Sequence, residues 1–260
     1  MMHELSPILV IAYRDLMKFL RDRQRIVFSL VFPLVFIAVL GGSINSNLAQ
    51  NVGYNYLTFI FIGVIAQTLF QTTASGVISL IEDRENDFSQ EIFVSPISRY
   101  SIIIGKILGE SLVAMVQLIG IFAIGFIIRV PLQMSHLILL IPFSLLVCLF
   151  GGAFGILILS NLGSQRSANQ IFPFIMFPQF FLAGVFTPIK TLPIYLLILS
   201  RIAPMTYAVD LLRSIYYSGL PEINKVVLHP FILNLGVILA FTVIFISIGT
   251  FLFVKNEKNR

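Results

Sequence analysis

The sequence predicts an all-α integral membrane protein with six transmembrane helices. Of its 260 residues, 57% are hydrophobic and only 11% are charged, and the mean hydropathy is +0.95. A soluble domain carries roughly a quarter charged residues, so this composition indicates a membrane protein. The charged residues also lie mainly between long apolar runs, as expected for a chain that crosses a bilayer several times.

Six apolar runs are long enough to cross a membrane, since a spanning helix needs about 20 residues. They cover approximately residues 26–45, 56–81, 102–128, 136–160, 169–188 and 229–254. We therefore expect one transmembrane domain over residues 1–260. It would have a cytoplasmic loop at 82–98 and an extracytoplasmic region at 189–227.

Residues 1–25 predict an amphipathic helix that lies in the membrane interface before the first span. Its basic residues recur at helical spacing and would share one face: Arg14, Lys18, Arg21 and Arg25. The opposite face is apolar, which suits a helix with its charges toward anionic headgroups. Two interpretations stay open, a simple positive-inside anchor and an elbow helix that also touches a cytoplasmic partner.

The distribution of Lys and Arg predicts that both termini are cytoplasmic. With the N-terminus inside, twelve of the 17 basic residues face the cytoplasm and five face the other side. Cytoplasmic loops carry the excess of Lys and Arg, so this orientation is favoured. The expected host is a bacterial cytoplasmic membrane, with an organelle membrane as the alternative.

No sequence motif for ATP hydrolysis, metal binding or covalent chemistry is found. Gly105-Lys106 lacks the upstream glycine and the following hydroxyl residue of a phosphate-binding loop. His3, His136 and His229 are far apart, and the single Cys148 lies inside an apolar run. We therefore expect no enzyme activity, no cofactor and no metal in this chain, and no nucleic-acid partner.

The stretch IEDRENDFSQEIFVSPISR, residues 81–99, holds five of the twelve carboxylates. A charge at the bilayer centre costs about 2.5–3.5 kcal/mol, so this stretch must separate two spans. Asp87 and Gln90 fit a capping box for a short helix that ends before Pro96. Such a helix suits docking of a cytoplasmic partner, and an ordinary solvated loop is the alternative.

This segment resembles the loop between spans 2 and 3 of the ABC type-2 permeases, the membrane subunits of ATP-binding-cassette exporters. It shares an E-R-E-like start at 82–85, a later acidic residue, Ser95-Pro96, and Gly105-Lys106 at the next span. It departs from the family pattern at 87–91, where Gly-Thr-Leu-Glu is usual. The resemblance implies a coupling element for a separate ATPase subunit. Its residues would be Glu82, Asp83, Arg84, Glu85, Asp87, Phe88, Glu91, Ile92, Ser95 and Pro96.

A second match lies at 180–213, FFLAGVFTPIKTLPIYLLILSRIAPMTYAVDLLR. The resemblance implies a pair of re-entrant helices, about 191–200 and 204–217, between spans 5 and 6. Asp210 and Arg213 are three residues apart and could form an ion pair. The alternative is a surface loop with one amphipathic helix. The implied extracytoplasmic gate comprises Phe181, Gly184, Phe186, Pro188, Pro204, Tyr207, Asp210 and Arg213.

Three polar residues inside predicted spans are candidates for the transport pathway or for helix contacts. Glu110 either pairs with Lys106 four residues earlier or faces a cavity. Gln67 and Gln71 share one face of the second span and either bridge helices or line the pathway.

Together these features predict a permease subunit of an ATP-binding-cassette exporter for an amphipathic drug, lipid or lipid-linked glycan. The expected partners are a nucleotide-binding subunit that holds MgATP, a second permease copy or related chain, and membrane lipids. The alternatives are a stand-alone secondary transporter or channel, and a membrane anchor that recruits a partner without transport.

Overall fold

The computed structural model describes residues 2–45, 53–85 and 98–258, and these ranges contain helices and no strand. The prediction of an all-α protein is confirmed. The helices are α1 (Met2–Arg21), α2 (Arg23–Asn45), α4 (Tyr56–Gly76), α5 (Ser79–Glu85), α7 (Arg99–Ile127), α8 (Met134–Leu159), α9 (Gln165–Leu182), the 3-10 turn η1 (Ile189–Thr191), α10 (Ile194–Ile202), α11 (Pro204–Tyr216), α12 (Ile223–Val226) and α13 (Phe231–Lys258).

Within these ranges, four helical segments are long and apolar enough to cross a membrane. They are Tyr56–Asp83, Arg99–Ile127, Met134–Leu159 and Phe231–Asn256. The α10–α11 pair, bent by 89°, raises the number to five if it counts as one span. Helices α2 and α9 coincide with the first and fifth predicted spans, but the count of six spans stays a prediction.

Two predicted spans differ from the observed helices. The span predicted at 169–188 ends early, because α9 stops at Leu182 and Gly184 adopts φ +71°. The span predicted at 56–81 is present as Tyr56–Asp83, with two turn residues between the end of α4 at Gly76 and the start of α5 at Ser79. The first break turns the chain at one end of the bundle, and the second lies next to the charged residues of α5.

A polar side chain caps the first turn at the starts of α4, α7 and α9. Asn55 Oδ1 accepts a hydrogen bond from Thr58 N at the start of α4, over 3.0 Å. Ser98 Oγ and Ser164 Oγ accept in the same way at the starts of α7 and α9. Such caps satisfy backbone N–H groups that have no partner inside the helix.

The N-terminal helix is shorter than predicted, because α1 ends at Arg21. Asp22 follows, and its Oδ1 accepts a hydrogen bond from Arg25 N in the first turn of α2, over 2.9 Å. The prediction that Arg25 shares a face with Arg14, Lys18 and Arg21 is therefore wrong. Asp22 starts a new helix in another direction and carries Arg25 with it.

Helix α4 lies at the centre of the core and contacts α2, α7, α8 and α11. Most of its residues are buried, including every position from Thr58 to Phe70. Helix α8 approaches it closely through Gly151 and Gly155, whose missing side chains make room for the backbone of Phe70 and Ala74. Small residues commonly allow such contacts between membrane helices.

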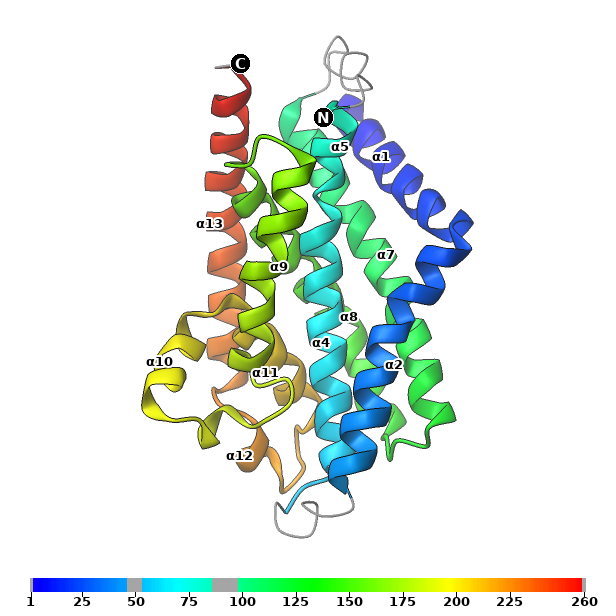
Figure 1. Cartoon of the computed structure of the whole chain (residues 1–260), viewed down its shortest axis with the longest axis vertical. Coiled ribbons are helices and arrows are strands. Elements are labelled where there is room, and N and C mark those ends of the chain that lie inside the picture. Colours follow the sequence, from blue (N-terminus) through cyan, green and yellow to red (C-terminus); the bar gives the residue numbers. More distant parts are fainter. Residues whose placement is uncertain (1, 46–52, 86–97, 259–260) are drawn as a thin grey trace.

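The two ends of the bundle differ. Helix α5, the start of α1 and the end of α13 lie at one end, while α10, α11 and α12 lie towards the other (Figure 1). The charged helix α5, in which the predicted coupling loop begins, and the region of the predicted gate thus lie towards opposite ends of the bundle (Figure 1).

We expect Gly155→Leu to lower the melting temperature of the detergent-solubilised protein by about 5 °C, because overpacking costs about 1–3 kcal/mol. A Cβ at Gly155 would overlap the carbonyl oxygen of Ala74. The matched control is Gly236→Leu in α13, where a Cβ would meet no atom within 4 Å. Equal melting temperatures for the two variants would contradict this account of the α4–α8 contact.

Candidate functional site

Helix α1 packs against α7 through two glycines of α7. A Cβ on Gly105 would lie 3.2 Å from the Cβ of Ile11, and one on Gly109 would lie 3.1 Å from the Cα of Ala12. Glycine at both positions lets the helix backbones come close together. The contact places the charged residues that follow each glycine, Lys106 and Glu110, beside α1.

These residues form a buried charge cluster with Asp15 of α1. The Nζ of Lys106 lies 2.7 Å from Oδ2 of Asp15 and 3.7 Å from Oε1 of Glu110. The three residues are 4% exposed or less. Because an isolated charge is costly to bury, each member needs its partners in place. The predicted pairing of Glu110 with Lys106 is present, with Asp15 as the nearer partner of Lys106.

A second ion pair ties α1 to α5. Arg14 donates a hydrogen bond from Nη2 to Asp83 Oδ2 over 2.8 Å, and the same nitrogen lies 3.1 Å from Asp15 Oδ1. Burial lowers the pKa of Arg14, but the carboxylates of Asp15 and Asp83 outweigh it and raise that pKa above its ordinary value. Arg14 thus connects α5 to the buried charge cluster.

Glu110 also lies against the break between α4 and α5. A Cβ on Gly76, the last residue of α4, would overlap the Glu110 carboxylate. On the other side, Nη2 of Arg25 lies 3.7 Å from Oε2 of Glu110. Helices α2, α4 and α7 therefore meet at this one carboxylate.

A polar cavity of about 270 Å³ opens beside the buried charge cluster. Its lining comes from α1, α2, α4, α5, α7, α9 and the α4–α5 break. The lining residues are Asp15, Lys18, Arg25, Ser75, Gly76, Ile78, Ser79, Glu82, Lys106, Glu110, Gln165 and Asn169.

An apolar cavity of about 370 Å³ adjoins the polar cavity. The two share Ser75, Ile78 and Asn169 in their linings. The apolar cavity runs between α4 and α9 and is lined by Gln71 together with Phe172, Pro173, Met176, Phe177 and Phe180. The two cavities thus lie side by side, the first lined by charged residues and the second mainly by aromatic ones.

Four of the ten predicted coupling residues lie in α5: Glu82, Asp83, Arg84 and Glu85. Glu82 lines the polar cavity, Asp83 binds Arg14, and α5 contacts α9. The other six lie outside the described residues: Asp87, Phe88, Glu91, Ile92, Ser95 and Pro96.

The predicted pathway residues have different surroundings. Glu110 and Gln71 line the polar and the apolar cavity, respectively. Gln67 is fully buried, and within the described ranges neither polar atom of its side chain has a hydrogen-bond partner. Gln67 therefore forms no hydrogen-bonded bridge to a helix in those ranges.

The predicted gate residues lie around the turn after α9 and along α11. Phe181 is exposed at the end of α9, and the centre of its ring lies 6.0 Å from that of Phe186. The Phe186 ring in turn stacks on Phe36 of α2.

The other predicted gate residues shape the backbone. Gly184 supplies the positive φ that the turn requires. Pro188 precedes η1, and Pro204 begins α11, where its fixed φ suits the first helical position. Tyr207 donates from its hydroxyl to the carbonyl of Arg201 over 2.7 Å.

The expected ion pair between Asp210 and Arg213 is wrong, because the two side chains have separate partners. Asp210 accepts hydrogen bonds from Leu228 N and His229 N, over 2.7 Å each, and from Asn234 Nδ2 over 2.9 Å. It therefore fixes the segment that leads into α13.

Arg213 holds the other side of α11. It donates hydrogen bonds to the carbonyls of Gly184, Val185 and Phe59, and its guanidinium lies 3.5 Å from the centroid of the Phe59 ring. Arg213 is fully buried, so these carbonyls and the ring replace its hydration. It thereby fastens the turn after α9 to α4.

Sequence reasoning missed the roles of Asp15, Arg14, Arg25 and Asn169. A signal was present for the first: Asp15 is the one acidic residue among the basic residues at 14–21. A second signal is GKILGE, residues 105–110, in which a glycine followed by a charge recurs after four residues. This spacing puts both glycines on one helix face and both charges beside it.

A family model described as ABC-2 type transporter matches residues 7–217, which include most of α1, the buried charge cluster, both cavities and the gate region. The chain belongs to the ABC-2 type transporter family. The prediction of a permease subunit of an ATP-binding-cassette exporter is thereby confirmed, and the family implies an ATP-binding-cassette partner.

Relatives with curated names support the same family. The chain is 24% identical over 261 residues to the putative transport permease ycf38 of Cyanophora paradoxa, covering 98% of this chain and 90% of the relative. It is 30% identical over 182 residues to the probable multidrug ABC transporter permease YbhR of Escherichia coli K12, covering 66% of this chain and 48% of the relative. A ycf38 permease of Porphyra purpurea is 24% identical over 192 residues, or 72% of this chain and 66% of the relative.

We expect Lys106→Met to destabilise the protein by about 3–5 kcal/mol, because it leaves Asp15 buried without its nearest cation. Adding Asp15→Leu removes the unpaired charge, so the double variant should regain part of the loss. The free energy of unfolding, measured by SDS titration in mixed micelles, tests both. Lys255→Met, at an exposed position, is the control. Additive effects of the two substitutions would contradict the ion pair.

Proposed function

We propose that this permease moves an amphipathic compound (a drug, a lipid or a lipid-linked glycan) outward across a bacterial cytoplasmic membrane. Two permease chains, identical or related, would form the pathway, and two separate ATP-binding-cassette subunits carrying MgATP would drive it. The observation that carries this proposal is the pair of adjoining cavities beside α5, one charged and one aromatic, which together would form the passage. A compound with a polar head and an apolar body matches both environments.

The coupling role of residues 82–96 is supported by the connections of α5. Asp83 is ion-paired to α1, and α5 contacts α9, whose side chains line the apolar cavity. A displacement of α5 by an ATPase subunit would therefore act on α1 and α9 together. Because the buried charge cluster joins α1 to α7, α7 would move with them.

The proposed membrane arrangement has six spans and cytoplasmic termini. Helices α2 and α9 would provide the first and fifth spans, and α1 would lie in the cytoplasmic interface. The bent α10–α11 pair would re-enter the membrane from the outer side, since its first helix presents exposed apolar residues such as Ile194, Ile198 and Ile202. The placement of α5 and α10–α12 towards opposite ends of the bundle supports this orientation (Figure 1).

A second permease copy is supported by exposed aromatic side chains along α9. Phe174, Phe177 and Phe181 are each more than half exposed on this helix. Phe177 also lines the apolar cavity, so a chain packed on these side chains would close the passage from the side. Lipid would cover the remaining apolar surface.

We expect Glu85→Arg and Phe88→Asp each to reduce transport and substrate-stimulated ATP hydrolysis to background, because both change the surface proposed to receive the ATPase subunit. The assay is uptake into inverted vesicles that contain the permease and its ATPase subunit. Membrane insertion should be unchanged, and Glu222→Arg, towards the other end of the bundle, is the control. Normal transport by both variants would refute the coupling role.

The purified permease alone should transport nothing. If it transported substrate without an ATPase subunit, the alternative of a stand-alone carrier would be correct. An ATPase subunit that binds but shows no substrate-stimulated hydrolysis would favour the membrane anchor.

We expect Gln71→Trp to lower transport at least about tenfold, because the indole would fill much of the apolar cavity. Co-purification with the ATPase subunit should persist, which separates a blocked passage from a failed assembly. Ile119→Trp, at a largely exposed position of α7, is the matched control. Unchanged transport by the Gln71 variant would place the pathway elsewhere.

A further inference from the structure

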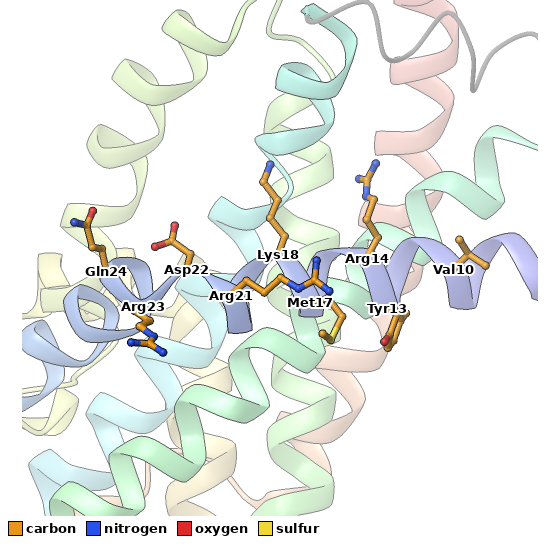
Figure 2. A pocket seen from close by; sticks show the side chains of 9 residues that line it. All are labelled: Val10, Tyr13, Arg14, Met17, Lys18, Arg21, Asp22, Arg23 and Gln24. Atoms are coloured by element: carbon orange, nitrogen blue, oxygen red, sulfur yellow. The ribbon is translucent and has the colours of Figure 1, made fainter.

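A stripe of mixed basic and apolar side chains runs along the outer side of α1 and around its junction with α2. We call this surface the elbow stripe, and it lines an open groove of about 950 Å³. It comprises Val10, Tyr13, Arg14, Met17, Lys18, Arg21, Asp22, Arg23 and Gln24 (Figure 2). The buried charge cluster lies on the opposite side of α1, and Lys18 is the one stripe residue that also lines the polar cavity.

The groove carries an excess of positive charge. Arg14 is ion-paired with Asp83, but Lys18, Arg21 and Arg23 are exposed, and none of the three has an ion-pair partner within the residues that the structure describes. The single carboxylate of the groove, Asp22, accepts a hydrogen bond from Arg25 N as the cap of α2. Three cations are therefore available to an anionic ligand.

Apolar side chains lie beside these cations. Val10 is 62% exposed and Tyr13 is 63% exposed. Figure 2 shows Arg14 and Lys18 projecting from one side of α1 and Tyr13 and Met17 from the other. Arg14 reaches Asp83 of α5, so the side of α1 that carries Arg14 and Lys18 faces α5. Arg23 projects to the same side as Tyr13 and Met17 (Figure 2). Cations next to exposed apolar side chains match a ligand with an anionic head and an apolar tail.

No described residue of this chain covers the elbow stripe. The inner face of α1, with Ile11, Ala12, Asp15 and Phe19, is already buried against the bundle. A protein partner at the cytoplasmic surface would match the cations but would leave Val10 and Tyr13 facing the membrane. A phospholipid satisfies both sides, because its phosphate and its acyl chains occupy adjacent depths of one leaflet.

We propose that the elbow stripe binds an anionic phospholipid of the cytoplasmic leaflet. Its phosphate would lie against Lys18, Arg21 and Arg23, and its acyl chain along Val10, Tyr13 and Met17. This inference rests on the proposed interfacial position of α1. Helix α1 is ion-paired to α5 and α7. A lipid held here would therefore stabilise the packing of α1 against these two helices, which the proposed coupling loop at 82–96 would move.

The chain contains no tryptophan, so Tyr13→Trp creates a single fluorescent reporter on the elbow stripe. The variant is reconstituted into nanodiscs of equal parts phosphatidylglycerol and phosphatidylcholine. In one preparation only the phosphatidylglycerol carries brominated acyl chains, and in the other only the phosphatidylcholine does. The lipid composition is otherwise identical, so a difference in quenching reports which lipid touches the stripe.

We expect brominated phosphatidylglycerol to quench the Tyr13→Trp emission clearly more than brominated phosphatidylcholine, since each basic residue near an anionic lipid contributes about a fivefold increase in affinity. Ile127→Trp, at an exposed position of α7 far from the stripe, should be quenched equally by both. Replacing Lys18, Arg21 and Arg23 by Gln should abolish the preference. Replacing Arg166, Arg201 and Lys255 by Gln, which removes the same charge elsewhere, should leave it intact.

Equal quenching of Tyr13→Trp by the two lipids would overturn the proposal. So would the absence of quenching by either lipid combined with a blue shift on addition of the ATPase subunit, which would identify the stripe as a protein-docking surface. Transport by the wild-type complex is measured separately. A complex that transports normally without a lipid preference would refute this inference and leave the proposed function standing.

Discussion

The structure depends on the burial of Lys106 between the carboxylates of Asp15 and Glu110. A buried charge without a partner is strongly destabilising, so α1 cannot leave α7 unless Asp15 and Lys106 are separated or solvated together. Gly105 and Gly109 bring the two helices close enough for this pair to form. The Asp15–Lys106 pair therefore fixes α1 on α7. Apolar contacts between the two helices would fix their relative position less specifically.

This constraint extends to the helices around the proposed passage. Arg14 continues the charge network to α5, and Glu110 lies against the last turn of α4, where the helix breaks. Helices α1, α4, α5 and α7 thus meet around one small polar cavity. The turn at residues 77 and 78 separates α5 from the part of α4 that packs on the glycines of α8. A force on α5 would reach the cavity lining over a short distance.

At the other end of the bundle, α11 connects segments that are distant in sequence. Asp210 holds the amides that lead into α13, and Arg213 holds the carbonyls after α9 and one carbonyl of α4. Both residues stay buried because backbone groups, with the Asn234 side chain for Asp210, supply their hydrogen bonds and the other charge does not. The turn after α9 and the start of α13 are therefore coupled through one short helix.

The sequence by itself determined the all-helical class, the position of most long helices and the family, because apolar length, helical periodicity and ordered motifs are local properties of the chain. It also indicated that Glu110 pairs with Lys106, since four-residue spacing puts both on one helix face. Only the tertiary structure decided that Asp15 is the nearer partner of Lys106, that Arg14 reaches Asp83, and that Asp210 and Arg213 turn to backbone groups. Spacing along a helix limits which side chains of that helix can meet. The nearest partners of these charged residues lie in other segments, and only the folded chain brings those segments within hydrogen-bond distance.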